Sequence, residues 1–287
     1  MPFVDLGAGL AVFRFQALSD DPRLVHFVST RAGGASRAPF ASLNLGYGVG
    51  DDPQAVAANR SRLAAALGVS PPDLVTGRQV HGSHVHRVGG AGTGPACRGR
   101  ADVGPPASGT APDPVPPAPV AEADALITAT PGACLTVLVA DCVPIVLFDP
   151  RTPAIGVAHA GWRGTVAGVA ARTVAAMTAA FGTRPGDLVV GIGPSIGPAD
   201  FEVGPEVAAA FARAFPEDWP GLVHAASGVR SRVDLWQANA RQLAAAGVTA
   251  GRIAVAGIST PAATDRFYSH RAEAGRTGRF AAGAVLR

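Results

Sequence analysis

The sequence contains no lysine, so all 24 of its basic side chains are arginines. This absence excludes enzymes that form a Schiff base through a lysine, enzymes that anchor pyridoxal phosphate on a lysine, and nucleotide-binding proteins with a Walker-type P-loop. The arginines are scattered without a basic run or interleaved aromatic side chains, and the formal net charge is only +3. We therefore expect no nucleic-acid-binding surface.

Charged residues and cysteines are also scarce. Charged residues make up 16% of the 287 residues and hydrophobic residues 48%, which excludes an intrinsically disordered chain. Cys97, Cys134 and Cys142 are an odd number in a long chain, which is not typical of a disulfide framework. No apolar run approaches the ~20 residues of a membrane span, and the N-terminus lacks the features of a secretory signal. We expect a cytoplasmic protein that does not associate with membranes, and nothing points to an obligate protein partner.

Short β-branched runs alternate with alanine-rich helical segments along the chain. We predict strands at 23–31, 78–88, 134–140, 144–149, 154–158, 187–193 and 252–259. We predict helices at 53–67 with Gly68 as the stop, at 165–181 between Gly164 and Gly182, at 203–215, and at 234–247 with Asp234 as N-cap. Residues 89–121 are rich in Gly, Pro and Ala without periodicity and are interpreted as a flexible surface insertion. The pattern predicts one mixed-sheet α/β domain over residues 1–287.

Two of the apolar runs end at a side chain that can bind a metal. Cys142 follows LTVLVAD and His159 follows AIGVA, while His81 lies in RQVHG. One cysteine and two histidines suit zinc, and three protein ligands leave the open position that a catalytic zinc needs. The spacing matches no CxxC or HExxH pattern, so an ordinary buried thiol at Cys142 and a structural histidine at position 81 fit the pattern equally well.

Other residues are candidates for substrate contacts or proton transfer. GWRG at 161–164 opens the predicted helix at 165–181, and a glycine turn with Arg163 at a helix N-terminus can hold phosphate. A tight strand-to-helix connection with Trp162 packed on the core is compatible with this role. Asp141 fits an outer-shell or proton-carrying role and a structural turn about equally. Arg31 and Asn44 lie beside glycine-containing turns.

Several segments together resemble one bacterial family over nearly the whole chain. The segments FVSTRAGG, RQVHG, ADALIT, ADCVPIVL, VAHAGWRG and YSHRAEAGRTGRF resemble the YfiH/YlmD family, whose members have been called laccase-domain or polyphenol oxidase proteins and multifunctional purine nucleoside phosphorylases. The resemblance implies a mixed α/β sandwich and zinc-dependent phosphorolysis of adenosine, inosine, guanosine and methylthioadenosine, together with adenosine deamination. Purine nucleosides and phosphate are then the expected substrates.

The resemblance also implies roles for particular residues. His81, Cys142 and His159 match the family's metal ligands and catalytic centre, and Arg31 and Asn44 match positions near its substrate pocket. Two features depart from the family pattern: the insertion at 89–121 is unusually long, and position 270 is histidine where the family commonly has arginine.

Three rival functions remain open at the level of the sequence. Copper also accepts His and Cys ligands, so copper-dependent phenol oxidation is one alternative. A four-copper oxidase needs several His-x-His pairs, however, and this chain has seven histidines and one such pair, His84 and His86. A cysteine hydrolase or amidase in peptidoglycan-precursor editing, with Cys142 as nucleophile and His159 as base, is the second alternative. A non-enzymatic binding module is the third, and it leaves the three metal-capable residues without a role.

Overall fold

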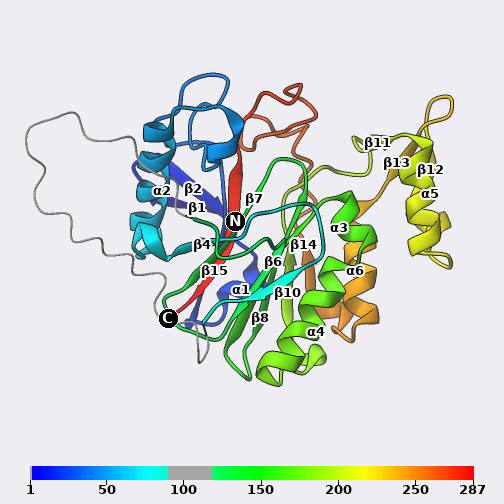
Figure 1. Cartoon of the computed structure of the whole chain (residues 1–287), viewed down its shortest axis with the longest axis horizontal. Helices are drawn as coiled ribbons and strands as arrows, with labels where there is room; N and C mark the ends of the chain where they lie inside the picture. Colours follow the sequence, from blue (N-terminus) through cyan, green and yellow to red (C-terminus); the bar gives the residue numbers. More distant parts are fainter. Residues whose placement is uncertain (1, 90–117) are drawn as a thin grey trace, which may run out of the picture.

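The computed structural model describes residues 2–89 and 118–287, and its architecture is built on two six-stranded sheets (Figure 1). The first sheet has the order β1 (Phe3–Gly7), β2 (Leu10–Phe13), β3 (Leu24–Ser29), β15 (Phe280–Leu286), β7 (Cys134–Val139), β4 (Leu74–Thr76). The second has the order β14 (Ile253–Val255), β10 (Val189–Ile192), β8 (Val143–Asp149), β9 (Ala154–Ala160), β6 (Ala125–Thr128), β5 (Val85–Arg87). Both sheets mix parallel and antiparallel pairs, as predicted.

Helices cover the outer faces of the two sheets. The helices are α1 (Gln16–Ser19), α2 (Pro53–Leu67), α3 (Trp162–Val166), α4 (Val169–Phe181), α5 (Pro205–Ala214) and α6 (Leu235–Ala245). Helix α2 packs on the first sheet, and α4 and α6 pack on the second (Figure 1). The two sheets face each other across a core that includes Val137 and Phe280 from one sheet and Phe148 and Val157 from the other. The predicted α/β sandwich is therefore confirmed.

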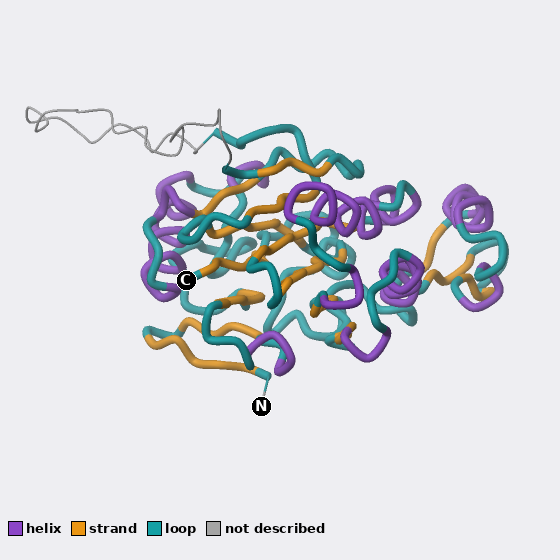
Figure 2. The backbone as a smooth tube through the Cα atoms, turned by 90° about the horizontal axis from the view of Figure 1, so that it is seen from below, coloured by secondary structure: helices purple, strands orange, loops and turns teal. Residues whose placement is uncertain are grey.

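A small three-stranded sheet lies at one end of the molecule. It has the order β11 (Glu202–Val203), β13 (Ser231–Val233), β12 (Val223–Ala225) and adjoins α5. Figures 1 and 2 both show these elements projecting from the side of the sandwich that carries α4 and α6. Phe201, which immediately precedes β11, lines a cavity.

Local capping determines several helix ends, as the sequence indicates. Helix α2 begins after Asp52, whose side chain accepts a hydrogen bond from the N–H of Gln54, and it ends at Gly68 with φ +68°. Helix α6 begins after Asp234, which accepts from the N–H of Gln237. The predicted start and end of α2 and the predicted start of α6 are confirmed, because capping residues act within a few residues of the chain.

The structure corrects three predicted elements and adds several others. The predicted strand at 252–259 is limited to Ile253–Val255. The predicted strand at 78–88 is wrong over residues 79–84, which form a loop, and only Val85–Arg87 is a strand. The predicted helix at 165–181 is two helices, α3 and α4, separated at Gly168 with φ +79°. Strand β15 was not predicted. Its residues, FAAGAVL, are mostly small and are all buried, so apolar and polar residues do not alternate along it. Besides β15, strands β1, β2, β4, β6, β11, β12 and β13 and helix α1 were not predicted. Most of the predicted insertion, residues 90–117, lies outside the described residues.

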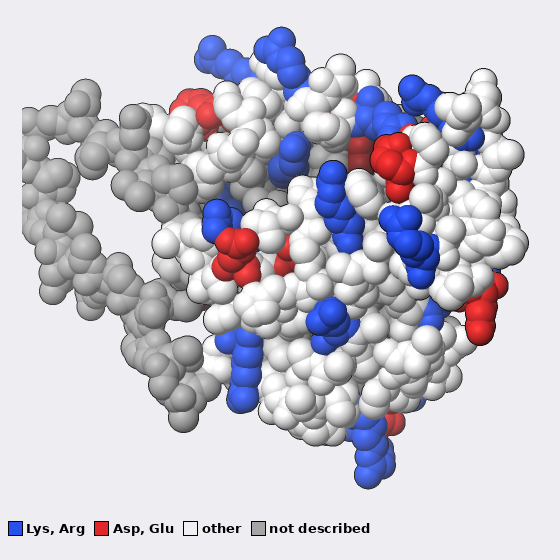
Figure 3. Space-filling model, turned by 45° about the vertical axis from the view of Figure 1, so that its right-hand side comes forward, with Lys and Arg blue, Asp and Glu red and all other residues white. Residues whose placement is uncertain are grey.

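Within the described part of the chain, no helix combines the length and the hydropathy that crossing a membrane requires. Figure 3 shows one face of the molecule, on which arginine side chains are dispersed among uncharged residues and do not form one continuous patch.

One buried histidine should make stability depend on pH. His26 on β3 is 1% exposed, and its Nε2 accepts a hydrogen bond of 2.8 Å from the N–H of Phe15. Burial, with the charge of Arg14, lowers the pKa of His26 from 6.5 to about 4. The folded state disfavours the protonated form of His26. The contribution of neutral His26 to stability is therefore fully present above pH 6.5 and is lost as the pH falls from 6.5 to about 4.

We expect the loss to approach about 3 kcal/mol in the free energy of unfolding. The measurement is urea denaturation of the wild type and of His26→Gln at several pH values between 7 and 4. Glutamine can still accept from the N–H of Phe15 but does not titrate, so the variant should lose less stability over this range. Equal pH dependence in the two proteins would contradict the prediction.

Candidate functional site

The register of the second sheet brings Cys142 and His159 to the same edge. Strands β8 and β9 are antiparallel, with Pro144 opposite His159. The start of β8 and the end of β9 therefore lie side by side, and Cys142, which immediately precedes β8, reaches the same place as His159. Strand β6 pairs with β9 on the other side, so that Asp124 adjoins His159, and the N–H of His159 donates to the carbonyl of Asp124 at 2.7 Å.

His81 reaches this edge from the loop between β4 and β5. The backbone at His81 is left-handed, with φ +61°, a conformation that L residues rarely adopt. The imidazole rings of His81 and His159 meet edge to face with their centroids 4.9 Å apart. The potential ligand atoms of His81, Cys142 and His159 all lie within 4.8 Å of one another. Three residues that are distant in the sequence thus converge.

The donor set fits a zinc ion. Zinc bonded to one sulfur and two imidazole nitrogens places those atoms about 3.3 to 3.6 Å apart in tetrahedral geometry. The observed separations require only small side-chain adjustments to meet that geometry. His159 Nδ1 is 2.8 Å from Asp124 Oδ1, which leaves Nε2 as the nitrogen available to a metal. His81 is exposed, Cys142 is half-buried and His159 is buried, so one side of the group is open.

The electrostatics of the group favour a deprotonated sulfur. Burial opposes ionisation of the Cys142 thiol, but the imidazoles of His159 and His81 outweigh it and lower the pKa of Cys142 from 9.0 to about 6. Burial likewise opposes protonation of His159, but Cys142 and Asp124 raise the pKa of His159 to about 9. Without a metal, the thiolate is thus paired with a protonated imidazole, and a binding cation would displace that proton.

Asp141 determines the direction in which Cys142 leaves the preceding turn. Its backbone is left-handed, with φ +82°. Its carboxylate accepts hydrogen bonds of 2.6 Å from the hydroxyl of Thr260 and from the N–H of Arg271, and its carbonyl accepts from the N–H of Ile196. These bonds offset the cost of the unusual backbone conformation and hold the residue next to Cys142 in place.

The glycines of the GWRG turn are required by close packing. A Cβ atom at Gly161 would lie 3.0 Å from both the sulfur of Cys142 and Cδ2 of His81. A Cβ atom at Gly164 would lie 2.9 Å from the carbonyl oxygen of Gly82. The short helix α3 therefore packs directly against the loop that carries His81.

The three converging residues line a cavity of about 680 Å³. Ligand cavities commonly have volumes of about 300 to 1,000 Å³. The other lining side chains include three aromatic residues, three arginines and one histidine: Tyr47, Trp162, Phe201, Arg78, Arg271, Arg279 and His270. The cavity can therefore accept a flat apolar group and an anion beside a metal-binding wall.

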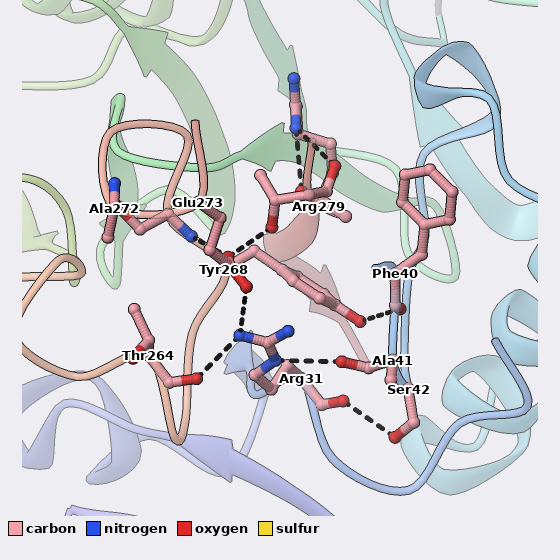
Figure 4. A network of polar contacts seen from close by, with 12 residues as sticks. Arg31, Phe40, Ala41, Ser42, Thr264, Tyr268, Ala272, Glu273 and Arg279 are labelled. Atoms are coloured by element: carbon pink, nitrogen blue, oxygen red, sulfur yellow. Dashed lines mark hydrogen bonds and ion pairs between the residues drawn. The ribbon is translucent and has the colours of Figure 1, made fainter. Parts of the chain in front are cut away.

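Arg31 lies outside this cavity, in a polar network at the base of the C-terminal loop (Figure 4). Its guanidinium donates to the carbonyls of Ala41 and Thr264 and forms an ion pair with Glu273 at 2.9 Å. It also lies over the ring of Tyr268. Arg31 thus contacts the loop that carries the cavity residues but does not line the cavity.

Asn44 and Arg163 also lie away from the lining residues. Asn44 is fully buried, and its Oδ1 accepts from the N–H groups of Gly46 and Arg279, both of which line the cavity. Arg163 is exposed, and its guanidinium lies over the ring of Trp162. A direct contact of any of these three predicted residues with substrate stays a prediction.

The sequence interpretation missed Asp124 and Arg279. Asp124 lies in the segment ADALIT and Arg279 in the segment YSHRAEAGRTGRF, both of which resemble the family, but the sequence interpretation gave neither residue a role. An acidic residue directly before strand β6 carries no specific signal by itself, and only the fold brings Arg279 to the cavity. His84, in the His-x-His pair, places Nδ1 2.7 Å from the carbonyl oxygen of Glu122. Neither His84 nor His86 joins a metal-capable group of three within residues 2–89 and 118–287.

Comparison with known proteins gives consistent relatives. A family described as multi-copper polyphenol oxidoreductase laccase matches residues 25–287. A protein named purine nucleoside phosphorylase from Bacteroides thetaiotaomicron is 35% identical over 274 residues, 95% of each chain. One of the same name from Deinococcus radiodurans is 41% identical over 88% of this chain and 86% of its own. The crystal structure of YlmD from Geobacillus stearothermophilus matches with a TM-score of 0.85 at 33% identity, covering 100% of this chain and 99% of that one.

Proposed function

The chain belongs to the laccase-like YfiH family, and on this premise we propose that it is a purine nucleoside phosphorylase that uses a metal ion held by His81, Cys142 and His159. The relatives named purine nucleoside phosphorylase support the reaction class. The proposal extends to zinc as the metal, to adenosine, inosine, guanosine and methylthioadenosine as substrates, and to adenosine deamination.

One observation carries the proposal. Three metal-capable side chains from separate segments meet on the wall of a cavity that has the volume of a small-molecule site. Tyr47, Trp162 and Phe201 on the same walls offer apolar surface to a purine base. A structural metal site normally has four protein ligands, whereas three leave a position for substrate or water.

Phosphate needs a cation at the cavity, and Arg279 is the best placed. The guanidinium of Arg78 is paired with Glu122, and that of Arg271 donates to the carbonyls of Asp200 and Glu202. Arg279 donates through one nitrogen to the carbonyls of Thr277 and Gly278 and forms no ion pair with a described carboxylate. Burial lowers the pKa of Arg279, and the nearby Cys142 and Asp141 partly offset this effect.

These placements assign roles to the residues of the chain. Arg279 would hold the phosphate dianion for attack at C1′ of the ribose while the purine leaves. Asp124 would hold His159, and the aromatic side chains would hold the base and exclude water. When bound, zinc supplies Lewis-acid chemistry and lowers the pKa of a water ligand to about 7, as deamination at C6 of adenosine requires.

A substrate screen with elemental analysis tests the proposal. Purified protein is incubated with each of the four nucleosides, with and without phosphate. We expect free base and the sugar 1-phosphate only when phosphate is present: ribose 1-phosphate from adenosine, inosine and guanosine, and 5-methylthioribose 1-phosphate from methylthioadenosine. We also expect inosine from adenosine in either condition, and about one zinc per chain for a three-ligand site. Absence of phosphorolysis from zinc-loaded protein would refute the proposed function.

Copper-dependent phenol oxidation is a second candidate because of the description of the matching family. A single three-residue group among the described residues provides for one metal ion, whereas multicopper oxidases use several. Protein made without added copper distinguishes the two functions. Stoichiometric copper together with phenol oxidation would favour this alternative.

A cysteine hydrolase is the third candidate, and the placement of Asp124 supports it. Such enzymes use a nucleophile, a base beside it and a carboxylate that orients the base. Cys142, His159 and Asp124 have this arrangement in space, with His159 Nδ1 at 2.8 Å from Asp124 Oδ1. The distinguishing measurement is mass spectrometry of metal-free protein after incubation with amide substrates. A covalent adduct on Cys142 with turnover would favour hydrolysis over phosphorolysis.

A further inference from the structure

The carboxylate of Asp124 contacts both segments that carry the histidines. Oδ1 accepts the N–H of His81 at 2.9 Å and lies 2.8 Å from Nδ1 of His159. Oδ2 accepts the N–H groups of Val80 at 3.1 Å and Gly82 at 2.7 Å. The side chain is 0% exposed. Both oxygens are therefore occupied, and each one accepts at least one hydrogen bond from the loop that carries His81.

The loop at 80–82 needs this anion. Three consecutive N–H groups point to one carboxylate, and the central residue, His81, is left-handed with φ +61°. Such a run of N–H groups forms a concave anion-binding nest. Without an acceptor, the three donors would lose their hydrogen bonds and the unusual backbone conformation would lose its support. The carboxylate thus determines where the His81 side chain points.

The same carboxylate determines the proton position on His159. An ionised carboxylate only accepts hydrogen bonds, so the nitrogen facing it, Nδ1, carries the proton. When a cation displaces the second proton of the ring, the lone pair is on Nε2, on the side of Cys142 and His81. The orientation and the tautomer of His159 are therefore both determined by Asp124.

We propose that Asp124 is the positioning residue of the metal centre, a single carboxylate that prearranges two of the three ligands at once. This inference rests on the proposed metal-binding function. Asparagine cannot replace Asp124, because its amide has one acceptor and one donor group. Its NH₂ must face either His159 or the N–H groups of Val80 and Gly82, so one of the two arrangements is lost in either orientation.

The experiment measures zinc affinity by chelator competition in the wild type and in Asp124→Asn. We expect the Kd for zinc to rise about 10- to 100-fold in the variant, the usual effect of removing a partner of a ligating histidine. Asp149→Asn is the matched control. Asp149 is also 0% exposed, and its Oδ1 accepts the N–H groups of Arg151 and Thr152 at the opposite end of β8, without a histidine. The zinc affinity of Asp149→Asn should match that of the wild type.

Two further measurements keep the inference testable if Asp124→Asn folds poorly. Hydrogen exchange of the metal-free wild type should show protected amides at residues 80–82, and imidazole ¹⁵N spectra of the zinc-loaded protein should show that Nδ1 of His159 carries a proton. Wild-type zinc affinity in folded Asp124→Asn, unprotected amides at 80–82, or an Nδ1 of His159 without a proton in the zinc-loaded protein would each overturn the inference. A wild-type chain that binds no zinc would instead refute the proposed metal site, and the exchange data would still decide whether Asp124 holds the loop.

Discussion

Replacing Cys142 by alanine is expected to abolish stoichiometric zinc binding and to lower nucleoside turnover at least about 100-fold. Loss of a ligand should exceed the 10- to 100-fold effect that is typical of losing an outer partner of a ligand. Cys142 contributes the only sulfur to the His81, Cys142, His159 group. Its lowered pKa, about 6, means that the thiolate is already the main form at neutral pH. Elemental analysis and phosphate-dependent release of base from inosine measure the two effects.

Cys134→Ala is the matched control for this variant. Cys134 on β7 is also a free cysteine, but it is completely buried, and burial raises its pKa to about 12. Its removal should cost some stability through a small cavity and leave zinc content and turnover near the wild type. Undiminished phosphorolysis by Cys142→Ala would contradict both the metal centre and the proposed function. Metal-free wild type that hydrolyses amide substrates while Cys142→Ala does not would support the cysteine hydrolase alternative.

Replacing Arg279 by glutamine is expected to raise the KM for phosphate about 10- to 100-fold, because hydrogen bonds to charged groups are worth about 1.5 to 3 kcal/mol. The side chain lines the cavity near Cys142 and Asp141 and has no carboxylate partner among the described residues. Adenosine deamination, which does not use phosphate, should change much less. Steady-state kinetics at varied phosphate, with deamination measured in parallel, separate the two effects.

Arg163→Gln distinguishes the structural from the sequence-based assignment. The GWRG pattern predicts that Arg163 holds phosphate, whereas the structure places its guanidinium in solvent over Trp162. Helix α3, which contains Arg163, spans only Trp162–Val166, so its dipole is small. We expect the KM for phosphate to stay within about threefold of the wild type, since exposed charges contribute little. A large increase for Arg163→Gln together with an unchanged Arg279→Gln would reverse the assignment.

The difference between these two arginines shows where sequence interpretation stops. Arg163 stands next to a recognisable glycine turn, so a local pattern draws attention to it. Arg279 has no local pattern, and it reaches the cavity because β15 is the central strand that joins β3 to β7. The position of β15 depends on close packing: a Cβ at Gly283 would lie 2.5 Å from the carbonyl oxygen of Leu135. Such fits between distant segments are not encoded in periodicity.

The same distinction applies to His81. The alternation in 78–88 predicts a strand, in which His81 would face away from His84 and His86. A tertiary contact decides otherwise, because the buried carboxylate of Asp124, 43 positions along the chain, draws the N–H groups around His81 into a left-handed turn. Local propensity is worth a fraction of a kcal/mol per residue, and several hydrogen bonds to a buried charge outweigh it.

By itself, the sequence determined the α/β class, both ends of α2, the start of α6, and the chemical character of the three metal-capable side chains, because capping, hydrophobic runs and donor chemistry act within a few residues. Only the tertiary structure decided that these side chains meet, that Asp124 contacts both the ring of His159 and the backbone N–H of His81, and that Arg279 rather than Arg163 lines the cavity. Those outcomes depend on strand register and on buried hydrogen bonds between segments far apart in the chain, and these form only when both sheets are packed.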